Sequence, residues 1–115
     1  CEHHLLPFNG RAVVAYIPRG GQIIGLSKIP RVVLHCGQRL QNQERLASQI
    51  ADTLNGVPGL DPLGVAVLVR SQHSCMAARG VKSDGSMVTS ALRGVFKTEP
   101  AARAEFLGLA QGLLL

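Results

Sequence analysis

The chain has 115 residues, twelve of them Lys or Arg and seven Asp or Glu, with no Trp and few other aromatic side chains. This length suits one domain with a modest aliphatic core, and no apolar run approaches the roughly 18 residues of a membrane span. The basic balance favours an anionic partner, but scattered cations and scarce aromatics suit nucleic acid poorly, so a phosphorylated small molecule fits better.

The first residues combine potential metal ligands with a predicted strand. Cys1 and His4 have a spacing found in many zinc sites, although a frayed terminus with solvated histidines would look the same. Residues 5–17 predict extended structure with a turn at Asn9-Gly10. The extended run 22–26 follows turn-forming residues and predicts a hairpin. No export segment opens the chain, so we expect a cytoplasmic protein; the start at Cys1 suggests a processed or truncated product.

Residues 28–54 predict a helical region that bends or breaks near residues 37–42. Ser27 can cap its start, with Pro30 tolerated in the first turn. In the second half, apolar residues recur every four positions, as on one face of a helix. These residues are Leu46, Ile50 and Leu54.

The second half of the chain predicts strands over residues 63–80 and 87–97, then a helix over 98–113. Thr98 would cap this helix, and Phe106, Leu109 and Leu113 would form its apolar face. The predicted order is β-β-α-α-β-β-α, which is one α+β domain with an antiparallel sheet.

A third metal ligand is predicted in the strand over residues 63–80. Side chains alternate along a strand, so His73, Cys75 and Arg79 would share one face. Cys75 would then join Cys1 and His4, and two thiolates with one imidazole leave a fourth position for water, as in catalytic zinc sites. The alternative is a buried cysteine with an incidental histidine and a surface arginine.

The other polar residues have open alternatives. His3 and His73 would be spare imidazoles for proton transfer, whereas Cys36 fits a small core residue. Lys28 and Arg31, at the predicted helix start, could bind phosphate or be solvated cations. Glu44 could accept two hydrogen bonds from a guanine-like edge or lie on the surface. Three widely spaced cysteines argue against a disulfide framework.

Several segments of the sequence resemble the zinc-dependent GTP cyclohydrolase I family, from Cys1 to about Leu109. In order, they are Cys-Glu-His-His-Leu-Leu-Pro-Phe, Ile-Gly-Leu-Ser-Lys, Arg-Leu-Gln-Asn-Gln-Glu-Arg-Leu, His-Ser-Cys-Met-Ala-Ala-Arg-Gly and Val-Thr-Ser-Ala-Leu-Arg-Gly-Val-Phe. The resemblance implies the tunnelling fold (T-fold), an antiparallel sheet with helices on one face. In this fold subunits form a barrel, and two pentamers stack into a homodecamer with active sites between subunits.

The resemblance also implies an activity: conversion of GTP and water to 7,8-dihydroneopterin triphosphate and formate, the first step towards folate or tetrahydrobiopterin. Roles carry over by motif. The Zn²⁺ ligands would be Cys1, His4 and Cys75, and the proton-transfer histidines would be His3 and His73. The ribose and triphosphate would be held by Ser27, Lys28, Arg31 and Arg79, with Ser27 also assisting catalysis. The guanine clamp would be Gln43 and Glu44.

Two departures from the family pattern affect these expectations. The family's N-terminal helical region does not precede the first motif, which would weaken triphosphate binding or assembly. The loop over residues 82–87 is about one residue shorter than usual, which could adjust the pocket entrance. Two other functions remain open: a related cyclohydrolase that stops early or uses another purine, and a non-catalytic binding or assembly subunit. The complete set of metal-ligating and proton-transfer residues argues against the non-catalytic subunit.

Overall fold

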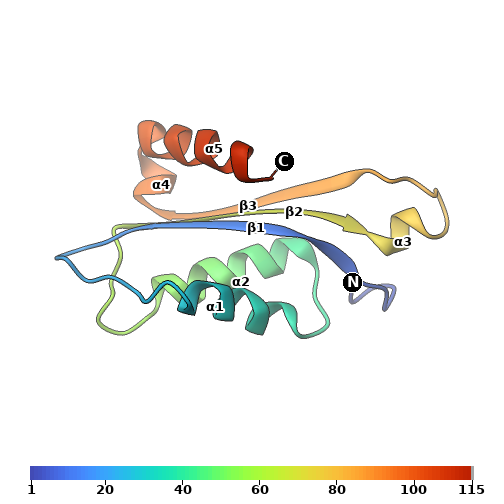
Figure 1. The fold of residues 1–115 in the computed structure, drawn as a ribbon, viewed down its shortest axis with the longest axis horizontal. Coiled ribbons are helices and arrows are strands. Elements are labelled where there is room, and N and C mark those ends of the chain that lie inside the picture. Colours follow the sequence, from blue (N-terminus) through green and yellow to red (C-terminus); the bar gives the residue numbers. More distant parts are fainter. Residues whose placement is uncertain (115) are drawn as a thin grey trace.

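A three-stranded antiparallel sheet in the order β1-β2-β3 forms the centre of the computed structural model, which describes residues 1–114. Its strands are β1 (Phe8–Ile17), β2 (Gly64–His73) and β3 (Ser86–Gly94). The helices are α1 (Lys28–Gly37), α2 (Gln43–Asn55), α3 (Ser74–Ala77), α4 (Val95–Thr98) and α5 (Pro100–Leu114) (Figure 1). The α+β class with an antiparallel sheet is therefore confirmed.

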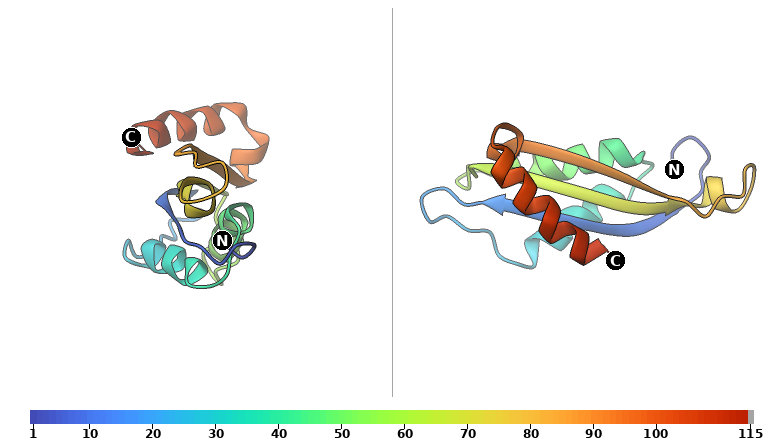
Figure 2. Two further views of the ribbon diagram at one scale, coloured as in Figure 1. Left: turned by 90° about the vertical axis from the view of Figure 1, so that its right-hand side faces the viewer. Right: turned by 90° about the horizontal axis from the view of Figure 1, so that it is seen from above.

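Helices cover both faces of the sheet, so the predicted arrangement with helices on one face is wrong. Helices α1 and α2 lie on one side, and α4 and α5 lie on the other (Figure 2). The cause is the continuous apolar run of the central strand β2. Val65 and Val67 pack with α2 in one cluster, whereas Leu68 packs with Phe106 of α5 in the other. Because both faces of β2 must be buried, each needs its own helical layer.

The predicted break in the first helical region is confirmed, since α1 ends at Gly37 and α2 begins at Gln43. Asn42 caps α2, because its side-chain oxygen accepts a hydrogen bond of 2.8 Å from the Arg45 backbone N–H. Ser27 occupies the equivalent position before α1, but its backbone is already helical and its side chain makes no capping hydrogen bond. The predicted Ser27 cap is therefore wrong.

The predicted hairpin after β1 is wrong, and so is the turn at Asn9-Gly10. Residues 22–25 have no regular secondary structure, and the Ile24 N–H donates to the Tyr16 hydroxyl at 3.0 Å instead of to a neighbouring strand. Asn9 and Gly10 lie inside β1, with Gly10 opposite Ser71. Together with the additional helices α3 and α4, this changes the element order to β-α-α-β-α-β-α-α.

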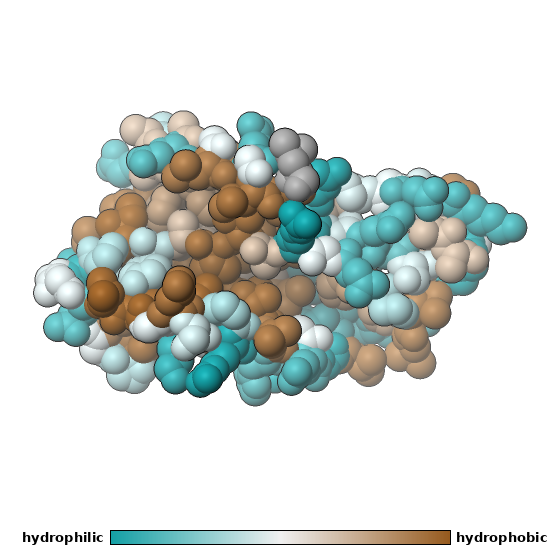
Figure 3. Space-filling model, in the orientation of Figure 1, coloured by the Kyte–Doolittle hydropathy of each residue, from teal (hydrophilic) through white to brown (hydrophobic). Residues whose placement is uncertain are grey.

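The last helix is confirmed, but its cap and its apolar face differ from the prediction. The preceding strand ends at Gly94, whose φ of +63° turns the chain into α4, and α5 begins at Pro100 and not after a Thr98 cap. Phe106 is buried, whereas Leu109 and Leu113 are 65% and 62% exposed. They border a cavity of about 250 Å³ between α5 and β1, and Figure 3 shows apolar side chains gathered between α5 and the sheet.

Among the described residues, no helix combines the length and apolar character required to cross a membrane.

Candidate metal centre

Cys1, His4 and Cys75 come together at one end of the sheet. Each offers one ligand atom, and these three atoms all lie within 4.8 Å of one another. The Cys1 Sγ and the His4 Nδ1 are 3.5 Å apart. The first four residues form a turn, closed by a 2.8 Å hydrogen bond from the Leu5 N–H to the Cys1 carbonyl, which brings the two ligand side chains to the same side. We call residues 1–4 the ligand turn.

Cys75 reaches this turn from a helix and not from a strand face. Strand β2 ends at His73, and Cys75 lies in the single turn of α3. The predicted common strand face of His73, Cys75 and Arg79 is therefore wrong; Arg79 is exposed beyond α3. A 3.0 Å hydrogen bond from the Ser74 N–H to the Pro7 carbonyl joins the start of α3 to the chain that follows the ligand turn.

Glu2, to which the sequence assigned no role, fastens the ligand turn to the start of α2. Its N–H donates to the Gln41 carbonyl at 2.8 Å, and its carboxylate accepts from the Asn42 side-chain amide at 3.2 Å. The same carboxylate forms an ion pair with Arg45. The hydrogen bond from Arg45 is the main cause that lowers the pKa of Glu2 below its ordinary value. No spacing rule points to these contacts, because they join segments about 40 residues apart in the sequence.

His73 lies in a buried hydrogen-bond network. Its Nε2 is 2.8 Å from the Gln43 Oε1, which also accepts a hydrogen bond from the Ser71 hydroxyl. The ring of Phe8 stacks on the imidazole, with ring centroids 4.6 Å apart. Burial lowers the pKa of His73, whereas the nearby Glu44 carboxylate raises it.

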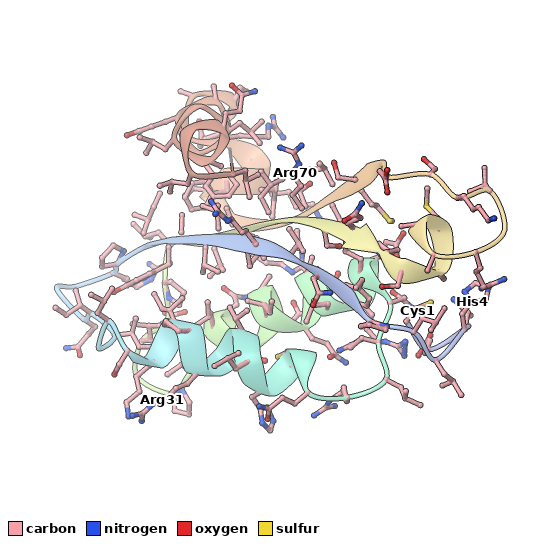
Figure 4. All side chains as sticks on the ribbon, turned by 45° about the vertical axis from the view of Figure 1, so that its right-hand side comes forward. Cys1, His4, Arg31 and Arg70 are labelled. Carbon is pink, nitrogen blue, oxygen red and sulfur yellow. The ribbon has the colours of Figure 1, made fainter. Side chains whose placement is uncertain are left out.

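The other predicted site residues have contrasting environments. His3, within the ligand turn, and Glu44, in the first turn of α2, are exposed, whereas Gln43 is only 1% exposed. The predicted phosphate-binding residues on α1 are exposed but lie elsewhere, and Figure 4 shows Arg31 on the opposite side of the molecule from Cys1 and His4. One copy of the chain therefore does not bring the α1 cations to the metal centre. Cys36, on α1, is buried in the core cluster formed by α1, α2 and the sheet, as predicted.

The fold and the site define a small α+β domain in which two cysteines and one histidine could hold a metal ion, with the partly buried His73 network beside them. A family model described as GTP cyclohydrolase I matches residues 1–111. The chain belongs to the GTP cyclohydrolase I family.

Curated relatives share more than half of the aligned residues with this chain. "GTP cyclohydrolase 1" from Caldanaerobacter subterraneus subsp. tengcongensis is 57% identical over 110 residues, which are 95% of this chain and 57% of the relative. The protein of the same name from Bacillus subtilis is 56% identical over 108 residues, or 93% of this chain and 56% of the relative. The chain therefore spans a little over half the length of these relatives. The family is metal-dependent, consistent with the Cys and His cluster at this site.

Proposed function

We propose that this chain is the catalytic domain of a zinc-dependent GTP cyclohydrolase I, which converts GTP and water to 7,8-dihydroneopterin triphosphate and formate. The observation that carries the proposal is the convergence of Cys1, His4 and Cys75 beside the His73 network. Family membership supplies the reaction, and the site supplies the groups that this reaction requires. A cytoplasmic location fits, because thiol ligands stay reduced in that compartment.

Zinc fits this donor set. Tetrahedral zinc has bonds of about 2.3 Å to sulfur and about 2.0 Å to nitrogen, which place neighbouring donor atoms about 3.5–3.8 Å apart. The Cys1 Sγ and His4 Nδ1 are separated by 3.5 Å, and all three donor atoms lie within 4.8 Å, so a small contraction completes three tetrahedral corners. When bound, zinc would supply Lewis acidity and lower the pKa of water at the remaining corner.

The chain's own residues would recognise the base and move protons. Glu44 is exposed, so its carboxylate can accept two hydrogen bonds from the N–H and NH₂ edge of guanine. His73 would protonate N7 of the purine, which favours opening of the five-membered ring, and the exposed His3 would exchange protons in the later steps. Burial lowers the pKa of His73, and an imidazole can accept a proton at a free ring nitrogen and pass it on.

The phosphates would be bound by a neighbouring copy of the chain. Lys28 and Arg31 are exposed on α1, and Arg31 lies far from Cys1 and His4, so they can serve only another subunit's metal centre. Ser27 lies at the start of the same helix, whereas Arg79 lies just beyond α3, on the side of its own metal centre. We therefore propose active sites between subunits, in the family's assembly of two stacked pentamers.

The decisive assay combines the purified chain with GTP and Zn²⁺ and follows both formate and the fluorescence of oxidised neopterin. Both products together support the proposal. Formate without neopterin identifies a related cyclohydrolase that stops early. If neither product forms, the enzymatic function is contradicted, and a non-catalytic binding subunit remains.

Metal analysis of two cysteine variants tests the ligand set separately. We expect about one zinc per chain in the wild type and in Cys36→Ala, because Cys36 is a core residue outside the site. Cys75→Ser should lose the metal, since two remaining protein ligands hold zinc poorly. Stoichiometric zinc in Cys75→Ser would show that the ligand assignment is wrong.

Nucleotide binding tests the base-recognition residue. Glu44→Ala should weaken GTP binding and leave the zinc content unchanged, while Glu99→Ala, an exposed carboxylate at the end of α4, should change neither. Unchanged GTP affinity in Glu44→Ala removes this residue from the guanine site.

A further inference from the structure

Gln43, the first residue of α2, is a buried amide whose two protons are both used inside the protein. Its side chain is 1% exposed, and its Nε2 donates to the backbone carbonyls of Val69 and Met87, both at 3.0 Å. These carbonyls belong to β2 and β3. They also fix the orientation of the amide, because the reversed rotamer would place Oε1 against two carbonyl oxygens.

The remaining atom of the amide, Oε1, can only accept hydrogen bonds. Ser71, which is 3% exposed, donates its hydroxyl proton to this oxygen. The His73 Nε2 lies 2.8 Å from the same oxygen, so this ring nitrogen must carry a proton in order to donate. Donor and acceptor counting therefore selects one tautomer of the neutral imidazole, with the proton on Nε2 and the lone pair on Nδ1.

Phe8 restrains the same ring from its face. The two rings are inclined by only 14°, with centroids 4.6 Å apart, so tilting the imidazole out of this plane would break the stacking. A 180° flip would keep the ring plane but move Nε2 away from the Gln43 Oε1. Within residues 1–114, Nδ1 has no hydrogen-bond partner, whereas Nε2 has two polar neighbours, Gln43 and Ser71. The ring is thus held through one nitrogen and left free at the other.

We propose that Gln43 is a positioning residue that holds His73 in the Nε2–H tautomer and leaves Nδ1 as the nitrogen that exchanges protons with the substrate. The part of this inference that concerns the substrate rests on the proposed function, whereas the tautomer is inferred from the hydrogen bonds alone. It gives the Gln43 side chain a role through His73 in place of direct contact with guanine, which leaves Glu44 as the side chain of the guanine clamp. A fixed tautomer matters because a general acid or base must present the correct nitrogen to the reacting atom.

The first test measures the tautomer itself and requires no catalysis. The zinc-loaded chain is labelled with ¹⁵N in its histidine rings, and the proton-coupled ring spectrum is recorded where His73 is neutral; the His73→Asn variant assigns the signals. We expect His73 to be protonated on Nε2 alone. Protonation on Nδ1 in the wild type overturns the proposal, whatever the variants do.

Two variants then separate the hydrogen bond from the stacking. Gln43→Met is similar in length but makes none of the four hydrogen bonds of Gln43, so His73 should become a mixture of both tautomers. Phe8→Leu removes the stacked ring but leaves the amide, so the Nε2–H form should persist. An unchanged tautomer in a folded Gln43→Met variant overturns the proposal. If Gln43→Met does not fold, the wild-type spectrum still tests whether His73 is protonated on Nε2.

The second test asks whether Gln43 acts through His73 during turnover. In Gln43→Met, kcat should fall by about 10- to 100-fold, as for other hydrogen-bond partners that orient a functional imidazole, with KM for GTP within about twofold of the wild type. In a His73→Asn background, the same substitution should have no further effect on kcat. An equal loss in both backgrounds, or an effect on KM alone, overturns the proposal. A wild-type chain that does not turn over GTP refutes the proposed function instead, and the tautomer measurement then decides this inference by itself.

Discussion

The close approach of β1 to β2 at Gly10 gives a sharp test of how the fold supports the site. A Cβ atom at this position would lie 1.9 Å from the Arg70 carbonyl oxygen and 2.5 Å from the Ser71 Cα. The first distance is about 1.5 Å short of the 3.4 Å at which ordinary van der Waals contact begins. Since both obstacles are backbone atoms, Gly10→Ala must push the two strands apart and cannot be relieved by a side-chain rotation.

The cost should lie near the upper end of the range for overpacked interiors, about 3 kcal/mol. For a domain of this size, such a loss lowers the melting temperature by roughly 10–20 °C. The damage should also reach the metal centre. Gly10 pairs with Ser71 and Phe8 pairs with His73, so movement of β1 shifts the ligand turn relative to Cys75. We expect zinc affinity to fall by about 10- to 100-fold, as for other changes that misplace metal ligands.

Urea unfolding and competitive zinc titration measure the two effects. The matched control is Gly108→Ala in α5, where a Cβ would meet nothing within 4 Å. This control should gain about 0.5–1 kcal/mol from the better helix propensity of Ala and bind zinc like the wild type. If Gly10→Ala unfolds at the wild-type urea concentration and keeps its zinc affinity, the link between strand spacing and site geometry is refuted.

Three further predictions, tested with five substitutions, concern separate contacts. Glu2→Gln should reduce the stability of the metal-free chain at neutral pH. The difference should shrink as the pH falls below 4.5 and disappear once the pH is below the lowered pKa of Glu2, because its ionised form is then lost in the folded chain as well. A difference that persists in acid would contradict this. Phe106→Ala should lower the free energy of unfolding in urea by about 3–5 kcal/mol. Leu109, which is 65% exposed, should lose less than about 1 kcal/mol when replaced by Ala. Equal losses would contradict the burial of Phe106 and the exposure of Leu109 on α5. Asn42→Ala should cost about 1 kcal/mol and Ser27→Ala about half of that or less, since only Asn42 makes a capping bond.

The regular helices could be predicted from the sequence because their signals are local. The four-residue spacing of Leu46, Ile50 and Leu54 is sufficient to place α2, and all three side chains are buried as expected. The motif around Cys1 and His4 likewise indicates a metal site, and the structure brings both residues together with Cys75. Neither inference requires knowledge of which strands pair.

The failed predictions depend on contacts between distant segments. Asn9-Gly10 has the composition of a turn, and only the register with Ser71 reveals that Gly10 is required for close strand approach. Cys75 follows the polar end of β2, and α3 has only four residues, so this single turn is too short to show a helical periodicity.

The role of Gln43 could not be predicted from sequence for a related reason. Its partners are the carbonyls of Val69 and Met87, 26 and 44 residues away, and backbone acceptors leave no mark in the sequence of side chains. A glutamine at the start of a helix, next to a glutamate, is typical of a polar surface position. Its burial follows only from the packing of α2 beneath β2 and β3.

The first turn of α2 links the two halves of the candidate site. Its residues 42 and 45 bind Glu2 and so hold the ligand turn, whereas Gln43 holds His73 and Glu44 faces the solvent beside it. A small rotation of this turn would therefore move the candidate metal ligands, the imidazole and the Glu44 carboxylate together. This shared support explains why a short motif, Asn42 to Arg45, carries so many polar residues at the start of an otherwise apolar-faced helix. Substitutions of Asn42 or Arg45, which hold the ligand turn through Glu2, should change metal binding and base binding together, because one rigid element positions both.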